Sequence, residues 1–168
     1  MLTRERLQEL LTYDPETGVF AWRRISRSNS EPIRKGAVAG SVDHHHGSYR
    51  RLKIDGCRYA AARVVWLWMT GHWPTLQVDH INLDSLDNRW SNLREATPSQ
   101  NKANSRAPAS NTSGFKGVCW QKNQRRWQAR ARVGGRRVYL GLYDTPGAAH
   151  AAYACVTEAS FGAFARMT

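Results

Sequence analysis

The chain has 168 residues, which is enough for one or two small domains, each with a modest core. Lys and Arg number 25 against 13 Asp and Glu, so the net charge is +12. Such an excess favours a polyanionic partner, because neutralising phosphates releases condensed counterions. A membrane surface is the weaker alternative. No apolar run approaches the length of a membrane span, and no basic amphipathic helix stands out.

The N-terminal residues and the cysteines indicate a cytoplasmic protein. Residues 1–6 contain no apolar signal-peptide segment. The three cysteines, Cys57, Cys119 and Cys155, are odd in number and widely spaced. We expect them to be reduced and unpaired, and their spacing excludes a zinc site built from cysteines.

The first elements are a short helix and a strand. Thr3 can cap a helix that extends to Leu11, residues 14–18 form a turn, and residues 19–22 form a strand. The basic, serine-rich segment 23–34 has no periodicity and predicts a loop. Contact with phosphate is one interpretation of its charge, and a solvated loop is the simpler one.

Short strands are expected at residues 37–41 and 49–54, with Asp55-Gly56 as a tight turn into a further strand at 58–60. Three adjacent histidines, residues 44–46, lie between the first two strands. Adjacent loop residues rarely converge on one metal ion. A solvated hairpin tip is therefore the better interpretation of these histidines.

The apolar segment 61–70 predicts a buried helix. It carries Val64, Val65 and Leu67 together with two tryptophans, and it ends at Gly71. Glycine is the usual residue at the end of a helix, and the aromatic side chains are most simply part of the core.

An acid and a histidine stand side by side in Asp79-His80, at the end of an apolar run. A loop rich in Asp and Asn follows. The motif Thr97-Pro98-Ser99-Gln100 then signals the start of a helix, with an N-cap, a proline at the first position and a glutamine three residues after the cap. Asn101 is therefore expected one turn into that helix, and a strand–loop–strand–helix hairpin could return it to Asp79.

These residues suit the hydrolysis of a phosphodiester, which needs an activated water and a cation at the phosphate. His80 can accept a proton near neutral pH, while Asp79 and Asn101 offer oxygen ligands to a hard cation. Such a site leaves most positions to water and phosphate, as Mg²⁺ prefers. The alternative is a buried Asp-His pair that only orders a loop. The Asn-x-x-x-Asn-Leu run at residues 88–93 and the capped helix favour the metal site.

Residues 105–113 have the composition of a linker, and we place a domain boundary near Ser110. The segment that follows, residues 111–168, carries 9 Lys and Arg against 2 Asp and Glu. It is more basic than the longer segment before it, as a dedicated DNA-binding module would be.

This basic segment predicts three strands, at residues 115–120, 126–133 and 137–140, with Gly134-Gly135 as a hairpin turn. A helix is expected from Pro146 to about Phe161. Alternation along the middle strand and helical periodicity then give the residues facing inward. In the helix these are Ala148, Ala149, Ala152, Tyr153 and Val156.

The other side of the predicted sheet is cationic. Its residues are Arg126, Gln128, Arg130 and Arg132 from the middle strand, joined by Lys116, Arg137 and Tyr139. An arginine stripe can keep a one-sided sheet soluble, but charges of mixed sign would serve solubility better. Binding to a polyanion is therefore the stronger interpretation.

Residues 2–106 resemble phage-type HNH homing endonucleases. The resemblance is carried by the run Tyr13-Asp14-Pro15-Glu16-Thr17-Gly18-Val19-Phe20-Ala21-Trp22 and by the motifs at 73–74, 79–82, 86–89 and 91–97. Residues 111–166 resemble the APETALA/ethylene-response-factor DNA-binding domain, through motifs at 115–118, 127–132, 137–141 and 143–145.

The resemblance implies an α+β protein: a ββα-metal (HNH) nuclease module with small antiparallel hairpins over residues 1–106, a linker over 107–113, and a three-stranded antiparallel sheet packed on one helix over 114–168. It makes His80 the general base and Asp79 a metal ligand. Asn92 would brace the loop that orients His80, and Asn101 would be the second ligand. The cofactor would be a divalent metal, Mg²⁺ or else Mn²⁺, and cleavage would leave 5′-phosphate and 3′-hydroxyl ends.

In the C-terminal module, the resemblance places Lys116, Arg130, Arg132, Arg137 and Tyr139 at positions that would meet the major groove of double-stranded DNA. The chain departs from the two families at three places. Ala62-Arg63 stands where relatives show His-Arg, Cys119 where an arginine is common, and Gly147-Ala148 where an acidic pair is common.

We therefore predict a metal-dependent DNA endonuclease with a C-terminal sequence-reading module. The alternative is a sequence-specific, regulatory DNA-binding protein whose nuclease half is inactive. A basic packaging protein is a third reading, but it would need no Asp-His-Asn constellation.

Overall fold

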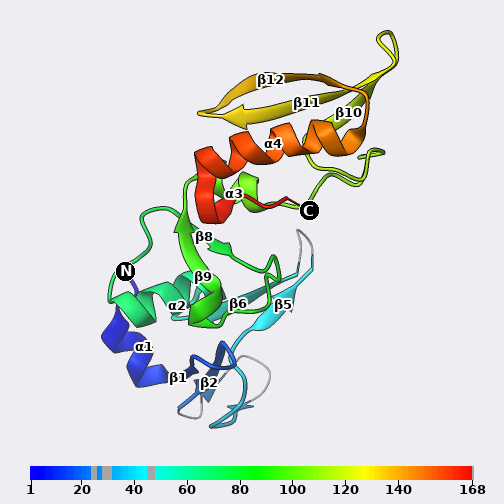
Figure 1. Ribbon diagram of the computed structural model, residues 1–168. Coiled ribbons are helices and arrows are strands. Elements are labelled where there is room, and N and C mark those ends of the chain that lie inside the picture. The colour runs from blue at the N-terminus through cyan, green and yellow to red at the C-terminus, as the bar shows by residue number, and fades with distance from the viewer. Residues whose placement is uncertain (24–25, 28–31, 45–47, 168) are drawn as a thin grey trace. The chain divides into compact units, whose positions relative to one another are not determined.

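The computed structural model describes residues 1–23, 26–27, 32–44 and 48–167, and it shows an α+β protein with small antiparallel sheets (Figure 1). The chain divides into two compact units, Met1–Glu95 and Ala96–Thr168, which are described separately. Among the described helices, none combines the length and the apolar character that crossing a bilayer requires.

The first unit begins with helix α1 (Arg4–Leu10) and a hairpin of β1 (Leu11–Asp14) and β2 (Val19–Trp22). The Thr3 hydroxyl accepts a hydrogen bond from the Arg6 backbone N–H at 3.2 Å, which caps α1 as predicted. Leu7 and Leu11 from this region are fully buried.

Within the predicted loop 23–34 the structure has two short paired strands, β3 (Ser26–Arg27) and β4 (Pro32–Ile33), while residues 24–25 and 28–31 lie outside the described residues. A three-stranded antiparallel sheet follows, with β5 (Ser41–Asp43), β6 (Tyr49–Ile54) and β7 (Cys57–Ala60) in that order. The prediction of a strand at 37–41 is wrong in its bounds. Val38 forms a single bridge with Ala21, and β5 begins only at Ser41.

The histidine-rich tip between β5 and β6 is described only in part, since residues 45–47 lie outside the described residues. His44 is exposed, and its Nδ1 lies 3.0 Å from the Ser48 hydroxyl. Nothing in the described part of the chain gathers three or more His, Cys, Asp or Glu side chains around a possible metal position.

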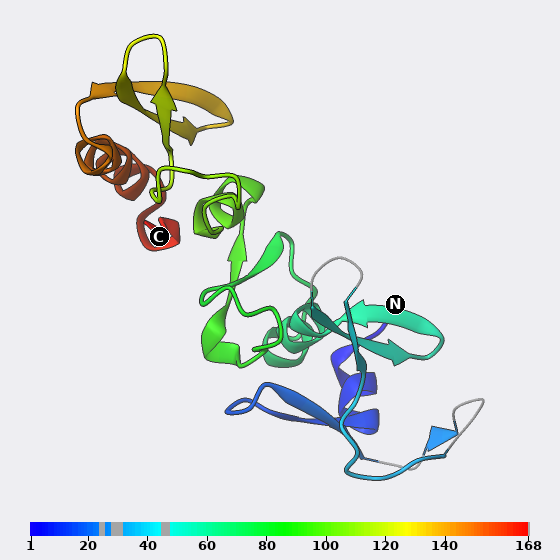
Figure 2. The same cartoon turned by 90° about the vertical axis from the view of Figure 1, so that its right-hand side faces the viewer.

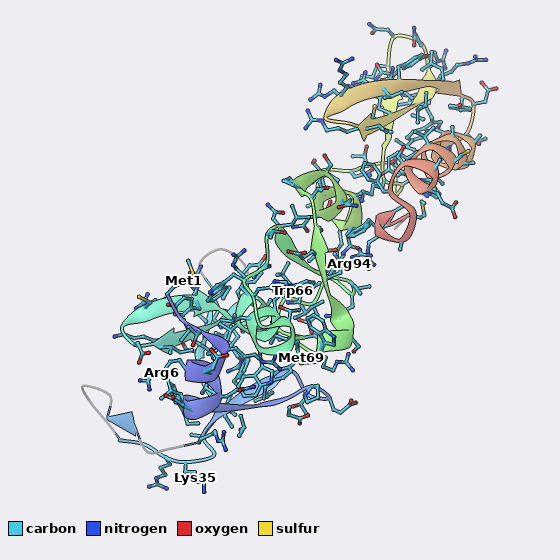
Figure 3. All side chains as sticks on the ribbon, turned by 90° about the vertical axis from the view of Figure 1, so that its left-hand side faces the viewer. Met1, Arg6, Lys35, Trp66, Met69 and Arg94 are labelled. Atoms are coloured by element: carbon cyan, nitrogen blue, oxygen red, sulfur yellow. The ribbon has the colours of Figure 1, made fainter. Side chains whose placement is uncertain are left out.

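Helix α2 (Ala61–Thr70) has the predicted bounds and ends at Gly71, whose φ of +85° is the left-handed conformation that glycine adopts most easily. Val64, Val65 and Leu67 are buried in the core of the first unit. Trp66 and Met69, labelled in Figure 3, are partly exposed.

After α2 the chain forms a two-stranded sheet from β8 (Gln77–His80) and β9 (Leu93–Ala96), joined through a short 3₁₀ helix, η1 (Trp90–Asn92). Helix α3 (Pro98–Asn104) comes next, so the order along the chain is strand, strand, helix. The start of α3 confirms the predicted capping box. Thr97 Oγ1 accepts from the Gln100 backbone N–H, and Gln100 Oε1 accepts from the Thr97 backbone N–H.

The second unit contains α3 and an antiparallel sheet of β10 (Val118–Gln121), β11 (Arg126–Val133) and β12 (Arg136–Tyr143). Helix α4 (Pro146–Phe161) packs against one face of this sheet and is followed by η2 (Gly162–Phe164); Figure 2 shows α4 nearly end-on. Val118, Ala129 and Ala149 are buried between helix and sheet. This arrangement confirms the predicted three strands and one helix.

Three details of the second unit differ from the prediction, the first being that β10 begins at Val118 and not at Phe115. Ala148 is exposed, because the buried line of α4 runs through Ala149, Tyr153 and Thr157 at a spacing of four residues. Strand β12 is longer than residues 137–140, since it continues past a bulge: Ala129 pairs with Gly141 and Arg130 with Tyr139, with one residue between the two partners.

Lys116 holds α3 within the second unit. Its ammonium group is buried and donates to the carbonyl oxygens of Ala103 at 2.5 Å and Ser105 at 2.6 Å. Burial lowers the pKa of Lys116 to about 8, with a further lowering from the positive charges of Lys102 and Arg166. This contact gives a physical reason why α3 belongs to the second compact unit, which begins at Ala96.

Candidate functional site

Asp79 and His80 end strand β8, and both are almost fully buried, at 4% and 9% exposure. A buried carboxylate needs a partner to remain charged. Arg94 on β9 provides one, since its Nε lies 2.9 Å from Asp79 Oδ2. The sequence therefore places the acid and the base together, and the paired strand supplies the cation that balances the acid.

Asn88 contacts the imidazole of His80. His80 Nε2 lies 3.3 Å from Asn88 Oδ1, and Asn88 is only 1% exposed. The Asn88 amide group donates its Nδ2–H to the Leu86 carbonyl oxygen at 3.1 Å, which turns Oδ1 toward the imidazole. Since Oδ1 can only accept, Nε2 carries the hydrogen in this contact.

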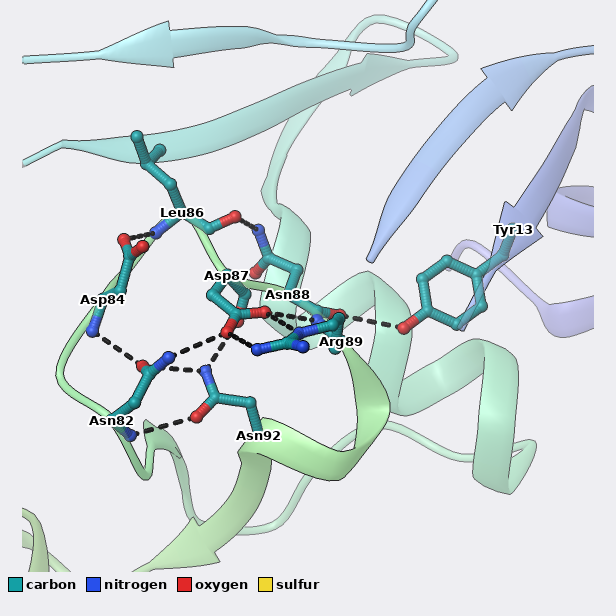
Figure 4. A network of polar contacts seen from close by, with 8 residues as sticks. All are labelled: Tyr13, Asn82, Asp84, Leu86, Asp87, Asn88, Arg89 and Asn92. Carbon is teal, nitrogen blue, oxygen red and sulfur yellow. Dashed lines mark hydrogen bonds and ion pairs between the residues drawn. The ribbon is translucent and has the colours of Figure 1, made fainter. Parts of the chain in front are cut away.

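Asn92 braces the loop that joins β8 to η1 (Figure 4). Its Nδ2 donates to the Asp87 carbonyl oxygen at 2.8 Å and to Asn82 Oδ1 at 3.0 Å, while its Oδ1 accepts from the Asn82 backbone N–H at 3.0 Å. The Asn92 carbonyl also accepts from the Ile81 backbone N–H at 2.9 Å. One buried asparagine thus fixes both ends of the loop that follows His80.

A charged pair completes this loop. Arg89 donates to both carboxylate oxygens of Asp87, at 2.8 Å from Nε and 2.6 Å from an Nη, and Asn82 Nδ2 donates to the same carboxylate at 2.7 Å. The Arg89 hydrogen bonds in particular lower the pKa of Asp87 to about 2. The loop therefore keeps its anion charged over the whole physiological range of pH.

The N-terminal hairpin supports the same loop from outside (Figure 4). The Tyr13 hydroxyl donates to the Asn88 carbonyl oxygen at 2.8 Å, and burial raises the pKa of Tyr13 to about 12. Gly18, at a φ of +71°, lies so close that a Cβ there would be 2.4 Å from the backbone of Asn88 and Arg89. The motif around Tyr13 and Gly18 thus has a structural meaning, because it holds the backbone of the residue that contacts His80.

The predicted site residues are distributed over both units. Asp79, His80 and Asn92 lie in the first unit, where Asp79 and His80 end β8 and the Asn92 carbonyl bonds to the next residue, Ile81. Asn101 lies on α3 in the second unit, where its backbone N–H bonds to the Thr97 carbonyl in the first helical turn, as predicted. Asn88 was absent from the predicted site, although its spacing of four from Asn92 was visible in the sequence.

The predicted DNA-contacting residues are found in two places. Exposed residues lie on the sheet face opposite α4; they are Arg126, Arg130, Arg132, Arg137 and Tyr139. Tyr139 is 58% exposed, and Arg126 pairs with Asp144 at 3.0 Å. Lys116 does not belong to this face, since its ammonium group is buried against the end of α3.

Residues 59–103 match the HNH endonuclease family, a segment that includes the buried Asp79-His80 pair and extends into α3. The chain belongs to the HNH endonuclease family. It is also similar to Protein 3.8 of Escherichia phage T7, with 33% identity over 81 residues that cover 46% of this chain and 67% of the phage protein. No solved structure matches the chain.

Proposed function

We propose that this chain is a metal-dependent DNA endonuclease of the homing type, which hydrolyses phosphodiester bonds in double-stranded DNA. The observation that carries the proposal is the buried His80, bonded through Nε2 to Asn88 and adjacent to Asp79, within the segment that matches HNH endonucleases. The cytoplasm of a bacterial host is the expected place of action, by analogy with the phage relative.

His80 is the general base in this proposal. Nε2 carries its hydrogen toward Asn88, so Nδ1 takes a proton from the water that attacks phosphorus. Asn88 and Asn92 do not touch the substrate. Asn88 sets the tautomer and the ring orientation, and Asn92 fixes the loop on which Asn88 is carried. Both are therefore positioning residues.

Asp79 and Asn101 are the proposed ligands of a divalent cation, with Mg²⁺ as the first candidate and Mn²⁺ as the second. Asp79 offers carboxylate oxygens, of which Arg94 holds one, and Asn101 would add an amide oxygen, as its place in the HNH motif implies. This donor set fits a hard cation that keeps several waters. A bound cation would neutralise charge on the scissile phosphate and stabilise the departing oxygen.

The sheet β10–β12 is the proposed sequence-reading module, similar to the APETALA/ethylene-response-factor domain. Its support is the exposed cationic face, with Arg130, Arg132 and Arg137 beside the exposed Tyr139. Arginines bind guanine edges and phosphates, and an aromatic ring can contact a base or sugar. We place Arg126 at the margin of this face, because it shares its charge with Asp144.

Plasmid cleavage tests the catalytic half of the proposal. Supercoiled plasmid is incubated with the full chain and Mg²⁺ or Mn²⁺, beside His80→Ala, an EDTA control, and His72→Ala as a matched variant of an exposed histidine. We expect nicked or linear product from the wild type and from His72→Ala. The loss of the general base should slow cleavage by about 10²- to 10⁴-fold in His80→Ala.

Two results would contradict the assignment. If His80→Ala cuts the plasmid as fast as the wild type, His80 is not the general base. Intact plasmid with the wild type, across several DNAs and both metals, would favour the alternative of a regulatory DNA-binding protein with an inactive nuclease half.

A further inference from the structure

The cationic sheet face is not uniformly charged, because one end of it carries uncharged polar side chains. In the register of β10 and β11, Cys119 lies opposite Gln128 and Gln121 lies opposite Arg126. Directly opposed residues of an antiparallel pair point to the same side of a sheet. Gln121 and Gln128 therefore share the face of Arg126, Arg130 and Arg132, but they contribute hydrogen-bonding groups without charge.

The two amide groups are held against each other. Gln121 Nε2 donates to Gln128 Oε1 at 2.8 Å, and the Cys119 thiol lies within hydrogen-bond reach of both, at 3.5 Å from Gln121 Nε2 and 3.8 Å from Gln128 Oε1. Both glutamines are half-buried, so each loses part of its rotamer freedom before any ligand arrives.

One NH₂ group and one carbonyl oxygen remain for a ligand. In the described part of the chain no protein group bonds to Gln128 Nε2 or to Gln121 Oε1. If both amides were turned over, the pair would still consume one oxygen and one NH₂ and leave one of each. The pair thus keeps one unused donor group and one unused acceptor in either orientation.

This combination complements one base in the major groove. Adenine presents an acceptor at N7 beside a donor at N6, whereas guanine presents two acceptors, cytosine a donor, and thymine an acceptor with a methyl group. We propose that the Gln121–Gln128 pair reads an A·T base pair, next to arginines that bind guanine edges and phosphates. The inference rests on the proposed DNA-binding function of the sheet.

Holding the pair in place lowers the cost of recognition. Immobilising a flexible side chain on binding opposes association, and the bond between the two amides has already restricted both glutamines. Because neither side chain is charged, the pair should affect which base is chosen without affecting how binding depends on salt.

The test is a selection of preferred sites from random duplexes, made with the full chain in EDTA so that the DNA stays intact. Wild type is compared with Gln128→Ala, Gln121→Ala and the control Gln124→Ala, which alters an exposed glutamine in the β10–β11 turn. We expect one adenine position in the wild-type site, with about tenfold or greater preference over other bases. That preference should be lost in the first two variants and kept in the control, with an unchanged salt dependence.

Gln128→Glu keeps the shape of the side chain and its acceptor for Gln121, but replaces the outward NH₂ with an oxygen. Glutamate accepts a hydrogen bond from cytosine N4, so the preference at this position should move from adenine to cytosine. If all variants select the wild-type site, the pair only supports the hairpin and the inference is wrong. If the wild type binds no duplex, the proposed DNA-binding function itself fails.

Discussion

The loop after His80 and the outer face of the β10–β12 sheet are both rich in polar groups, but they hold them in opposite ways. In the loop, Asn88 and Asn92 are 1% and 7% exposed and bond to backbone or side-chain partners within the same unit. On the sheet, Arg130, Arg132 and Arg137 are exposed to solvent.

The difference follows from what each region is proposed to do. A general base acts only within a narrow range of positions, so its neighbours must be fixed by packing and by hydrogen bonds. A phosphate-binding arginine acts mainly through its charge and must reach the ligand, so it is better left exposed. Substitutions of buried residues in the loop should therefore have large effects on cleavage that depend on the position. Substitutions of exposed residues on the sheet should have smaller effects on DNA binding that depend on charge.

Apart from the loss of His80 itself, the largest effect is expected from Asn88→Ala. Without the acceptor on Nε2, the imidazole of His80 loses a contact that helps to fix its ring orientation and tautomer, and plasmid cleavage should slow by about 10- to 100-fold. DNA affinity measured in EDTA should stay unchanged. Asn123→Ala, at an exposed asparagine in the β10–β11 turn, is the matched control.

The variant Asn88→Asp shows whether Asn88 acts by orienting the His80 imidazole or only by stabilising the fold. A carboxylate keeps the acceptor and adds a negative charge, which favours the protonated imidazole. Cleavage should then partly recover, and the acid side of its pH–rate profile should move to higher pH. An unshifted profile with full activity in both Asn88 variants would mean that Asn88 only supports the fold.

Gly18→Ala tests the support of the loop from the N-terminal hairpin. A Cβ at Gly18 meets the Asn88 and Arg89 backbone at 2.4 Å, and the φ of +71° disfavours any other residue. The free energy of unfolding should fall by about 2–3 kcal/mol. Gly36→Ala is the control: its φ is +83°, but nothing lies within 4 Å, so urea unfolding should show a loss of only about 1 kcal/mol. If both variants lose the same free energy of unfolding, the close contact of Gly18 with the loop does not stabilise the protein.

Much of this architecture follows from local sequence signals. The Thr97 capping box, the Gly71 end of α2 and the Gly134-Gly135 turn each depend on residues within one turn of chain, so the sequence predicts them well. The sequence gives Asn88 no role in the site and places Lys116 among the DNA-contacting residues, because the partners of both residues are far along the chain. Tyr13 reaches Asn88 across 75 residues, and Lys116 reaches the end of α3 across 13 and 11. Alternation placed Lys116 with the arginines, and only packing showed its ammonium group to be buried.

On the sheet, the double variant Arg130→Ala with Arg132→Ala should weaken DNA binding by about tenfold near physiological salt. If both arginines neutralise phosphates, the slope of log K against log salt should fall by about 2. Cleavage at saturating DNA should be little changed. The paired Arg130→Lys and Arg132→Lys variant keeps the charge, so it should retain the salt slope. An unchanged affinity in the alanine variant would place the DNA-binding surface elsewhere.

The smallest effect is expected at the Asp87–Arg89 pair, where the Asp87 side chain is 12% exposed and the Arg89 side chain is 49% exposed. Arg89 holds the pKa of Asp87 at about 2, below the ordinary value of 3.8. A carboxyl whose pKa is lowered on folding stabilises the native state above the unfolded pKa, and that contribution is lost as the pH falls toward the folded pKa. In Arg89→Ala the pKa of Asp87 should rise toward 3.8.

The stability difference between wild type and Arg89→Ala should therefore be present at pH 7 and shrink between pH 4 and pH 2. Solvent screening of the exposed arginine keeps it small. Titration of the Asp87 carboxyl by NMR checks the direction, and urea unfolding at pH 7 and pH 3 checks the consequence. If the Asp87 pKa stays near 2 without Arg89, then Asn82 and the Arg89 backbone N–H hold the anion. The charge of Asp87 would then be held by hydrogen bonds within the loop and would not depend on the exposed arginine side chain.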